Sequence, residues 1–150
     1  MLGRFRESLG MPLSAVFGLA LLGVPRVVAH DLRLAGTLVN ALLVFVPIAV
    51  WLAVVLWLRV PNAFRTLLIV GVIYGVLLGV VHQLLWAQAF GGDAPILGGN
   101  LAGALAPTAE RLLLRAFAFL SSLVTGVLVG AGTGMVGWVI AKAVPGFRKH

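Results

Sequence analysis

Six of the polar side chains inside the long apolar runs of this chain are its best candidates for chemistry. They are Asn40, His82, Gln83, Ser121, Ser122 and Thr125. A polar group inside an apolar run costs free energy unless it hydrogen-bonds, and such residues often mark ligand or ion sites. No Asp, Glu, Lys or Arg lies deep inside the predicted runs, which argues against a carrier coupled to protons or cations. The pattern therefore admits a site for a neutral or anionic solute.

The same residues also admit a structural interpretation. His82 can hydrogen-bond to Ser121, Ser122 or Asn40 across a helix contact, a bond worth about 0.6–2 kcal/mol. Beside the runs stand further polar residues that can hold a lipid head group or form a rim. They are His30, Asp31, Arg33, Arg111 and Arg115. As an alternative, Asp31 and Glu110 pair with the neighbouring arginines at the water interface.

The pattern gives little support to enzymatic chemistry. A serine nucleophile needs a base within reach, and only similar depth relates His82 to Ser121 or Ser122. A metal site needs several His or carboxylate ligands together, yet His30, His82 and Asp31 stand at no characteristic spacing. The chain has no cysteine, which removes thiol catalysis and thiolate ligands. We predict no catalysis, no cofactor and no metal.

Membrane helices are the elements that must position these residues. Of the 150 residues, 61% are hydrophobic and 10% are charged, against about 45–50% and about 25% in soluble domains. A helix needs roughly 20 apolar residues to cross a bilayer core. We predict an all-α, polytopic integral membrane bundle of four transmembrane helices, forming a single domain over 1–150 in the cell membrane. The spans are expected at about 9–29, 35–58, 64–90 and 112–142, with an outer loop over 91–108.

The charged residues predict that both termini are cytoplasmic. With four spans, one side collects seven cations and the other four, and positive charge concentrates on the cytoplasmic side. The larger set is Arg4, Arg6, Arg59, Arg65, Lys142, Arg148 and Lys149, and the smaller is Arg26, Arg33, Arg111 and Arg115. The six polar residues are then all expected in the outer half of the membrane. The net charge of +7 thus reports orientation, and we expect no nucleic-acid partner.

One alternative concerns the first span. The sequence at 27–29 resembles a signal-peptide cleavage site after an apolar run. Cleavage there would leave the other three helices in the same orientation.

Local patterns predict where several elements begin or bend. Asn62 is expected to cap the third helix, and Thr108 the fourth. Pro47 removes one backbone donor from the second helix, so we expect a kink there. The segment 91–108 is rich in Gly, Pro and Ala, and should lie along the membrane surface or fold back onto the bundle.

Small residues at every fourth position form the clearest packing pattern. They are Gly71, Gly75 and Gly79 in the third span, and Gly126, Gly130 and Gly134 in the fourth. This spacing puts them on one helix face, where a second backbone can approach closely. We expect the third and fourth helices to pack together, or one groove to receive another chain.

Two functions follow from these patterns. The first is an accessory or assembly subunit of a membrane complex, which acts by helix–helix packing and whose partners are lipid and a second copy or another membrane protein. The alternative is a small homo-oligomeric channel or transporter for a neutral or anionic solute, with its polar site in the outer membrane half.

Overall fold

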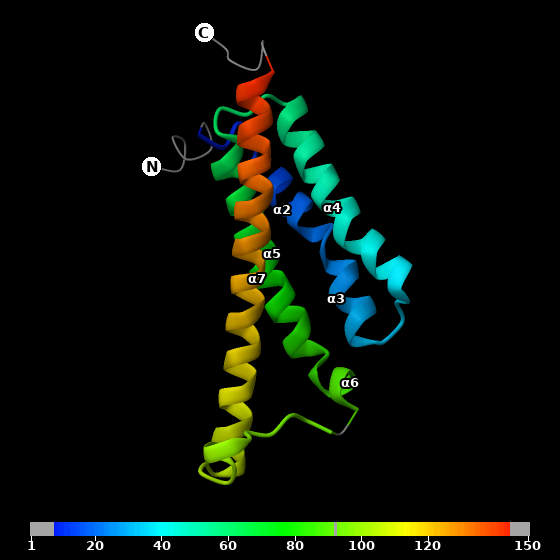
Figure 1. Ribbon diagram of the computed structural model, residues 1–150, viewed down its shortest axis with the longest axis vertical. Coiled ribbons are helices and arrows are strands. Elements are labelled where there is room, and N and C mark those ends of the chain that lie inside the picture. The colour runs from blue at the N-terminus through cyan, green and yellow to red at the C-terminus, as the bar shows by residue number, and fades with distance from the viewer. Residues whose placement is uncertain (1–7, 92, 145–150) are drawn as a thin grey trace.

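The computed structural model describes residues 8–91 and 93–144, and within these ranges it contains helices and no strand. The order of elements along the chain is shown in Figure 1. They are α2 (Leu13–Leu21), α3 (Val24–Asp31), α4 (Thr37–Trp57), α5 (Ala63–Leu84), α6 (Trp86–Phe90), a 3₁₀ turn (Gly99–Leu101) and α7 (Pro107–Ala143). The prediction of an all-α chain is confirmed for the described residues.

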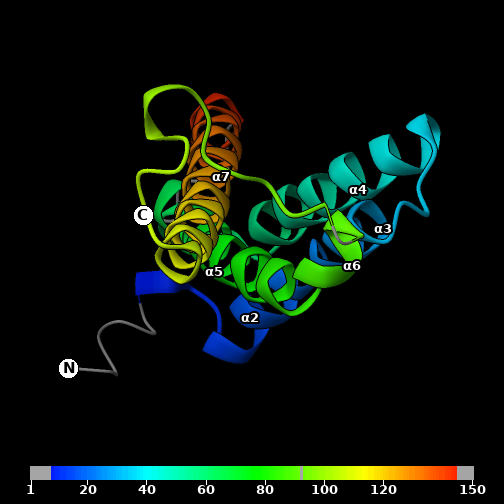
Figure 2. The ribbon, with the colours of Figure 1, turned by 90° about the horizontal axis from the view of Figure 1, so that it is seen from below.

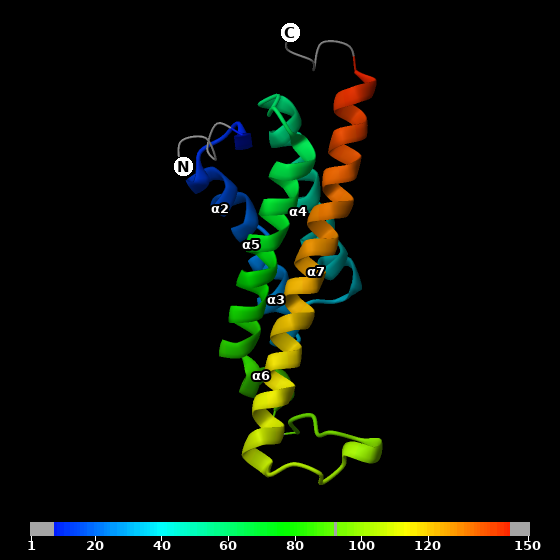
Figure 3. The ribbon, with the colours of Figure 1, turned by 90° about the vertical axis from the view of Figure 1, so that its left-hand side faces the viewer.

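Four stretches of helix are long and apolar enough to cross a membrane. They are Leu13–Asp31 (α2 with α3), α4, α5 and α7. The start of α2, the 58–62 turn and the end of α7 lie at one end of the bundle (Figures 1 and 3). The other end, called the α6 end below, carries α6 and the 91–106 segment. Four of the cations used to predict orientation, Arg4, Arg6, Arg148 and Lys149, lie outside the described residues.

The first span is broken, whereas the sequence predicted one continuous helix over 9–29. Pro25 has no N–H to give to the preceding turn, and the chain changes direction between α2 and α3 at Leu22 and Gly23. The carbonyl oxygen of Leu19, which accepts the backbone N–H of Leu22, also accepts the indole Nε1–H of Trp51 in α4 at 2.6 Å. The Tyr74 ring fills the space beside Gly23, where a Cβ would stand 2.6 Å from Cδ2 of Tyr74. The break is therefore held by α4 and α5.

The third and fourth spans also differ from their predicted ends. α5 ends at Leu84, and the short α6 follows it, so the expected helix over 64–90 is interrupted at Leu85. α7 begins at Pro107, five positions before the predicted 112, with Ala106 as its N-cap. Thr108 is therefore inside the helix, and the prediction that it is the cap is wrong. Proline suits the first helical position because the N–H it lacks would have no partner there.

The remaining helix ends follow simple capping rules. The prediction for Asn62 is confirmed, because its Oδ1 accepts the backbone N–H of Arg65 at 2.9 Å. α3 and α4 each end with an arginine in the left-handed region, Arg33 at φ 54° and Arg59 at φ 48°. In both places the next residue's N–H bonds back five positions, as in a Schellman motif. α4 continues as one helix through Pro47.

The glycine faces of α5 and α7 lie against each other (Figure 3). A Cβ placed on Gly71 would stand 2.5 Å from the carbonyl oxygen of Gly126, and one on Gly75 would stand 3.0 Å from that of Leu123. Such close approach of two backbones replaces the hydrophobic drive that is missing in lipid. Gly79 faces the Phe119 ring and Gly134 faces Phe64, so the contact extends beyond the glycine pairs.

The 91–106 segment runs across the α6 end, from α6 to the start of α7 (Figure 2). Its apolar residues are largely exposed, with Ile96 at 80% and Leu101 at 54%. Glu110 holds it by accepting the backbone N–H of Leu97 at 2.6 Å. The segment thus spans the end of the bundle and does not fold back into it.

Candidate functional site

A polar cavity of about 410 Å³ lies between α3, α5 and α7, toward the α6 end. Its polar lining comes from all three helices. The residues are Arg26, His30, Asp31, His82, Ser121, Ser122 and Thr125. Four of the six polar residues that the sequence placed inside apolar runs therefore meet at one site. His30 and Asp31, which were predicted as rim residues, join them there.

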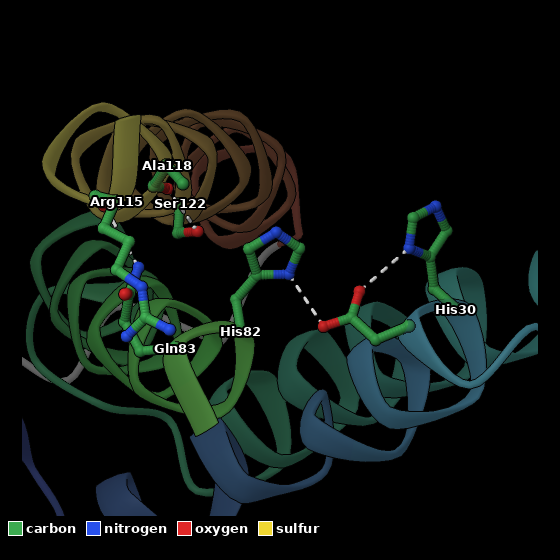
Figure 4. Close-up of polar contacts among 7 residues, drawn as sticks. His30, His82, Gln83, Arg115, Ala118 and Ser122 are labelled. Atoms are coloured by element: carbon green, nitrogen blue, oxygen red, sulfur yellow. Dashed lines mark hydrogen bonds and ion pairs between the residues drawn. The ribbon is translucent and has the colours of Figure 1, made fainter. Parts of the chain in front are cut away.

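Asp31 is the centre of the hydrogen-bond network in this cavity. Its carboxylate is buried, and the residue is 2% exposed. His82 reaches it from α5, with 2.7 Å between Nδ1 and Oδ2, and His30 lies 3.2 Å from Oδ1 (Figure 4). A carboxylate only accepts hydrogen bonds, so both imidazoles present Nδ1–H to it.

These contacts correct two expectations. His82 bonds to Asp31 and not to Ser121, Ser122 or Asn40. Asp31 is not paired with an arginine at the water interface either, because α3 continues to this residue and turns it toward α5. The sequence could not show this rotation, since it depends on the break at Gly23.

Arg26 is the functional candidate that the sequence analysis missed. It stands one turn before His30 on α3, and its Nε is buried without a hydrogen-bond partner among the described residues. No ion pair joins it to a described carboxylate. From the sequence, Arg26 was counted only among the orienting cations, although the span expected over 9–29 includes it. The structure places Arg26 inside α3, within a stretch that is long and apolar enough to cross a membrane.

Two of the three hydroxyl residues that α7 contributes to the cavity have already used their donors. Ser122 Oγ donates to the carbonyl oxygen of Ala118 at 2.9 Å, and Thr125 Oγ1 donates to that of Ser121 at 2.9 Å. A hydroxyl oxygen keeps two lone pairs after its proton is donated. Ser122 and Thr125 therefore offer acceptors, whereas Arg26 on the opposite wall offers donors.

A second, apolar cavity of about 40 Å³ adjoins the first. Its walls are Leu43, Val44, Pro47 and Ile48 of α4, with Val129 of α7. Trp51 and Tyr74 close it on the side of the 58–62 turn. Arg26 and Thr125 line both cavities, so the two spaces meet at the unpaired guanidinium.

The other predicted site residues lie elsewhere. Asn40 lines neither cavity, and Gln83 donates to the carbonyl oxygen of Arg115 at 3.0 Å. Arg33 donates to the Ala89 carbonyl oxygen at 3.4 Å, Arg111 lies 3.5 Å from the Thr108 hydroxyl, and Arg115 stacks over the Trp86 ring at 5.2 Å. Glu110 holds the 91–106 segment and pairs with no arginine in the described part of the chain.

Within residues 8–91 and 93–144, no group of three or more His, Cys, Asp or Glu side chains is arranged to hold a metal. Asp31, His30 and His82 are joined by hydrogen bonds, and Arg26 beside them would repel a cation. Comparison with protein-family models, curated proteins and solved structures finds no match to this chain.

Proposed function

We propose that the chain is a multi-pass protein of the cell membrane, with both termini cytoplasmic, that binds an anionic group in the polar cavity. The orientation rests on the division of the cations predicted from the sequence, seven on one side of the membrane, with Arg59 among them, and four on the other, following the positive-inside rule. The α6 end then faces outward, and the cavity lies in the outer half of the membrane.

Arg26 is the observation that carries this proposal. A guanidinium with a buried, unpartnered N–H is costly in a medium of low dielectric constant, and an anion removes most of that cost. Arginine also presents a planar fork of donors that matches carboxylate and phosphate groups. The single carboxylate in the cavity, Asp31, is already engaged by His82 and His30. The position beside Arg26 is thus open to an anion from outside the protein.

The cavity leads toward the α6 end and not through the bundle. Beyond it, toward the 58–62 turn, Trp51, Val55, Leu67 and Val70 form a core with at most 1% exposure. This arrangement supports binding from the outer face in the conformation described here. Transport by an oligomer of this chain would need a rearrangement, for which the α2–α3 break next to Arg26 is the best placed element.

The test is binding of inorganic phosphate and acidic lipids to protein purified in a neutral detergent. We expect Arg26→Gln to weaken binding of an anionic probe at least about tenfold, the range of one lost charge-assisted hydrogen bond. Arg26→Lys should restore part of it. Arg65→Gln is the matched control, because Arg65 is an exposed arginine that lines neither cavity. Equal binding by the Arg26→Gln and Arg65→Gln variants for every anionic probe would refute the proposal.

A second candidate is the accessory or assembly subunit, and one observation favours it. Gly18 of α2 and Gly132 of α7 have nothing within 4 Å of an added Cβ, so another helix can approach both closely. Gly71, Gly75 and Gly126, in contrast, are already covered inside the chain. Native mass spectrometry in mild detergent tests this candidate: a second copy or partner should be lost in Gly132→Leu or Gly18→Leu. A monomer with no partner before any substitution contradicts it.

A further inference from the structure

We infer that the anionic ligand is an amphiphile, an acidic phospholipid whose head group lies in the polar cavity and whose chain enters the apolar cavity. The inference rests on the proposed function, since it names the ligand class of the same site. A free inorganic anion would use only the polar cavity.

The polarity of the two cavities changes along the bundle in one direction. On α3, His30 and Asp31 lie nearest the α6 end, Arg26 comes one turn deeper, and Gly23 lies beyond it. Along α7 the lining changes in the same direction, from Ser121 and Thr125 to Val129. An outer-leaflet lipid has this same order, with its head group outward and its chains toward the midplane. The polar cavity thus lies at the depth of the lipid head group, and the apolar cavity lies at the depth of its chains.

The apolar cavity lies between α4 and α7, with Val44 and Ile48 of α4 and Val129 of α7 in its lining. The two helices lie side by side near the 58–62 turn and diverge toward the α6 end (Figures 1 and 2). We place the lipid chain between these helices, because the lining there is apolar and a water-soluble solute gains nothing from such a surface.

The hydrogen-bonding groups select among head groups. Arg26 offers donors to an anionic oxygen, whereas Ser122 and Thr125 have donated their protons to α7 and offer acceptors. A ligand that satisfies Arg26, Ser122 and Thr125 together carries an anionic oxygen and hydroxyl groups. Phosphatidylglycerol has this combination. Phosphatidylcholine has no hydroxyl in its head group and no net charge.

The experiment compares three probes on protein in neutral detergent: dioleoyl phosphatidylglycerol, dioleoyl phosphatidylcholine and glycerol 3-phosphate. Native mass spectrometry and competition against a fluorescent phosphatidylglycerol measure relative affinity. We expect phosphatidylglycerol to bind at least about tenfold tighter than either other probe. A charge-assisted hydrogen bond distinguishes it from phosphatidylcholine, and the roughly two or three methylenes that a cavity of about 40 Å³ can hold distinguish it from glycerol 3-phosphate. Arg26→Gln should remove this preference.

Variants that fill the apolar cavity separate the lipid from a free anion. Val44→Phe should weaken phosphatidylglycerol at least about fivefold and leave glycerol 3-phosphate unchanged, because only a chain needs that space. Val46→Phe is the matched control, since Val46 is 53% exposed and lines neither cavity. Val129→Leu repeats the test from the α7 wall. Unchanged glycerol 3-phosphate binding also reports that each variant is folded.

The outcomes distinguish the inference from the proposed function. Equal affinity for phosphatidylglycerol and glycerol 3-phosphate, unaffected by Val44→Phe and Val129→Leu but lost in Arg26→Gln, overturns the lipid and keeps the anion. Equal affinity for the two lipids also overturns the inference. Binding that is indifferent to Arg26→Gln overturns both.

Discussion

Replacing Gly71 by alanine should separate α5 from α7. The added Cβ would stand 2.5 Å from the carbonyl oxygen of Gly126 and 2.7 Å from the backbone nitrogen of Gly130. Ordinary contact begins at 3.4 Å, so the clash is about 0.9 Å. Both contacts are to backbone atoms, which cannot rotate away as a side chain can. The two helices must therefore move apart along the contact that holds them.

The loss of stability depends on whether the added methyl group meets backbone atoms or a side chain. Overpacking a tight interior costs about 1–3 kcal/mol, and a gap of about 0.5–1 Å forfeits a quarter to a half of each dispersion contact. We expect Gly71→Ala to lower the free energy of unfolding by about 3 kcal/mol. Gly79→Ala should cost less, about 1 kcal/mol, because it meets the Phe119 ring, which can turn.

The assay is reversible unfolding by sodium dodecyl sulfate in mixed micelles, followed by circular dichroism. Gly132→Ala is the control, because a Cβ at Gly132 meets nothing within 4 Å. It should leave stability unchanged or raise it by up to about 1 kcal/mol, the preference of a helix for alanine over glycine. The reasoning is refuted when Gly71→Ala and Gly132→Ala unfold at the same detergent fraction.

Substitutions at four further positions test other contacts with the same unfolding assay. Trp51→Phe keeps an aromatic ring but leaves the Leu19 carbonyl oxygen without the indole N–H and a space in the core, and should cost at least about 0.6–2 kcal/mol; no change would mean that this bond does not hold the α2–α3 break. Asn62→Ala removes the N-cap of α5 and should cost about 1 kcal/mol, whereas Asn62→Ser should retain most of it. His82→Leu leaves the buried Asp31 with only the exposed His30 and should cost about 3 kcal/mol or more. Asp31→Asn should cost less, because the amide oxygen still accepts the His82 N–H; the reverse order contradicts our account of the pair.

The number of helical spans was predictable because it depends on local composition. Apolar runs between charges predict where helices lie, and Asn62 predicts where one begins, since both follow from short-range physics. The break at Leu22 and Gly23 was not predicted, although Gly23 and Pro25 are visible in the sequence. Glycine and proline also occur in continuous membrane helices. Only the contacts of Trp51 with Leu19 and of Tyr74 with Gly23 show that the interrupted helix is stabilised here.

The site was predictable in part. The sequence could select His82, Ser121, Ser122 and Thr125 because a polar residue in an apolar run stands out wherever it points. Their partners depend on how each helix is rotated and tilted, which a single sequence does not contain. Arg26 shows the limit most clearly. Its charge is counted in the same way whether the side chain lies at the membrane surface or inside the bundle. Only its buried, unpartnered Nε shows that it lies inside the bundle.

The two left-handed arginines show how folding and membrane insertion can make different demands on one residue. A non-glycine residue in this region costs about 1–2 kcal/mol, so Arg33→Gly and Arg59→Gly should relieve the folded backbone equally. During biosynthesis the two changes act in opposite directions. In the proposed orientation Arg59 belongs to the cytoplasmic cations and Arg33 to the outer ones, so losing Arg59 weakens the orienting bias and losing Arg33 strengthens it. In that orientation, arginine at position 59 strains the backbone of the folded protein but favours correct orientation of the nascent chain in the membrane.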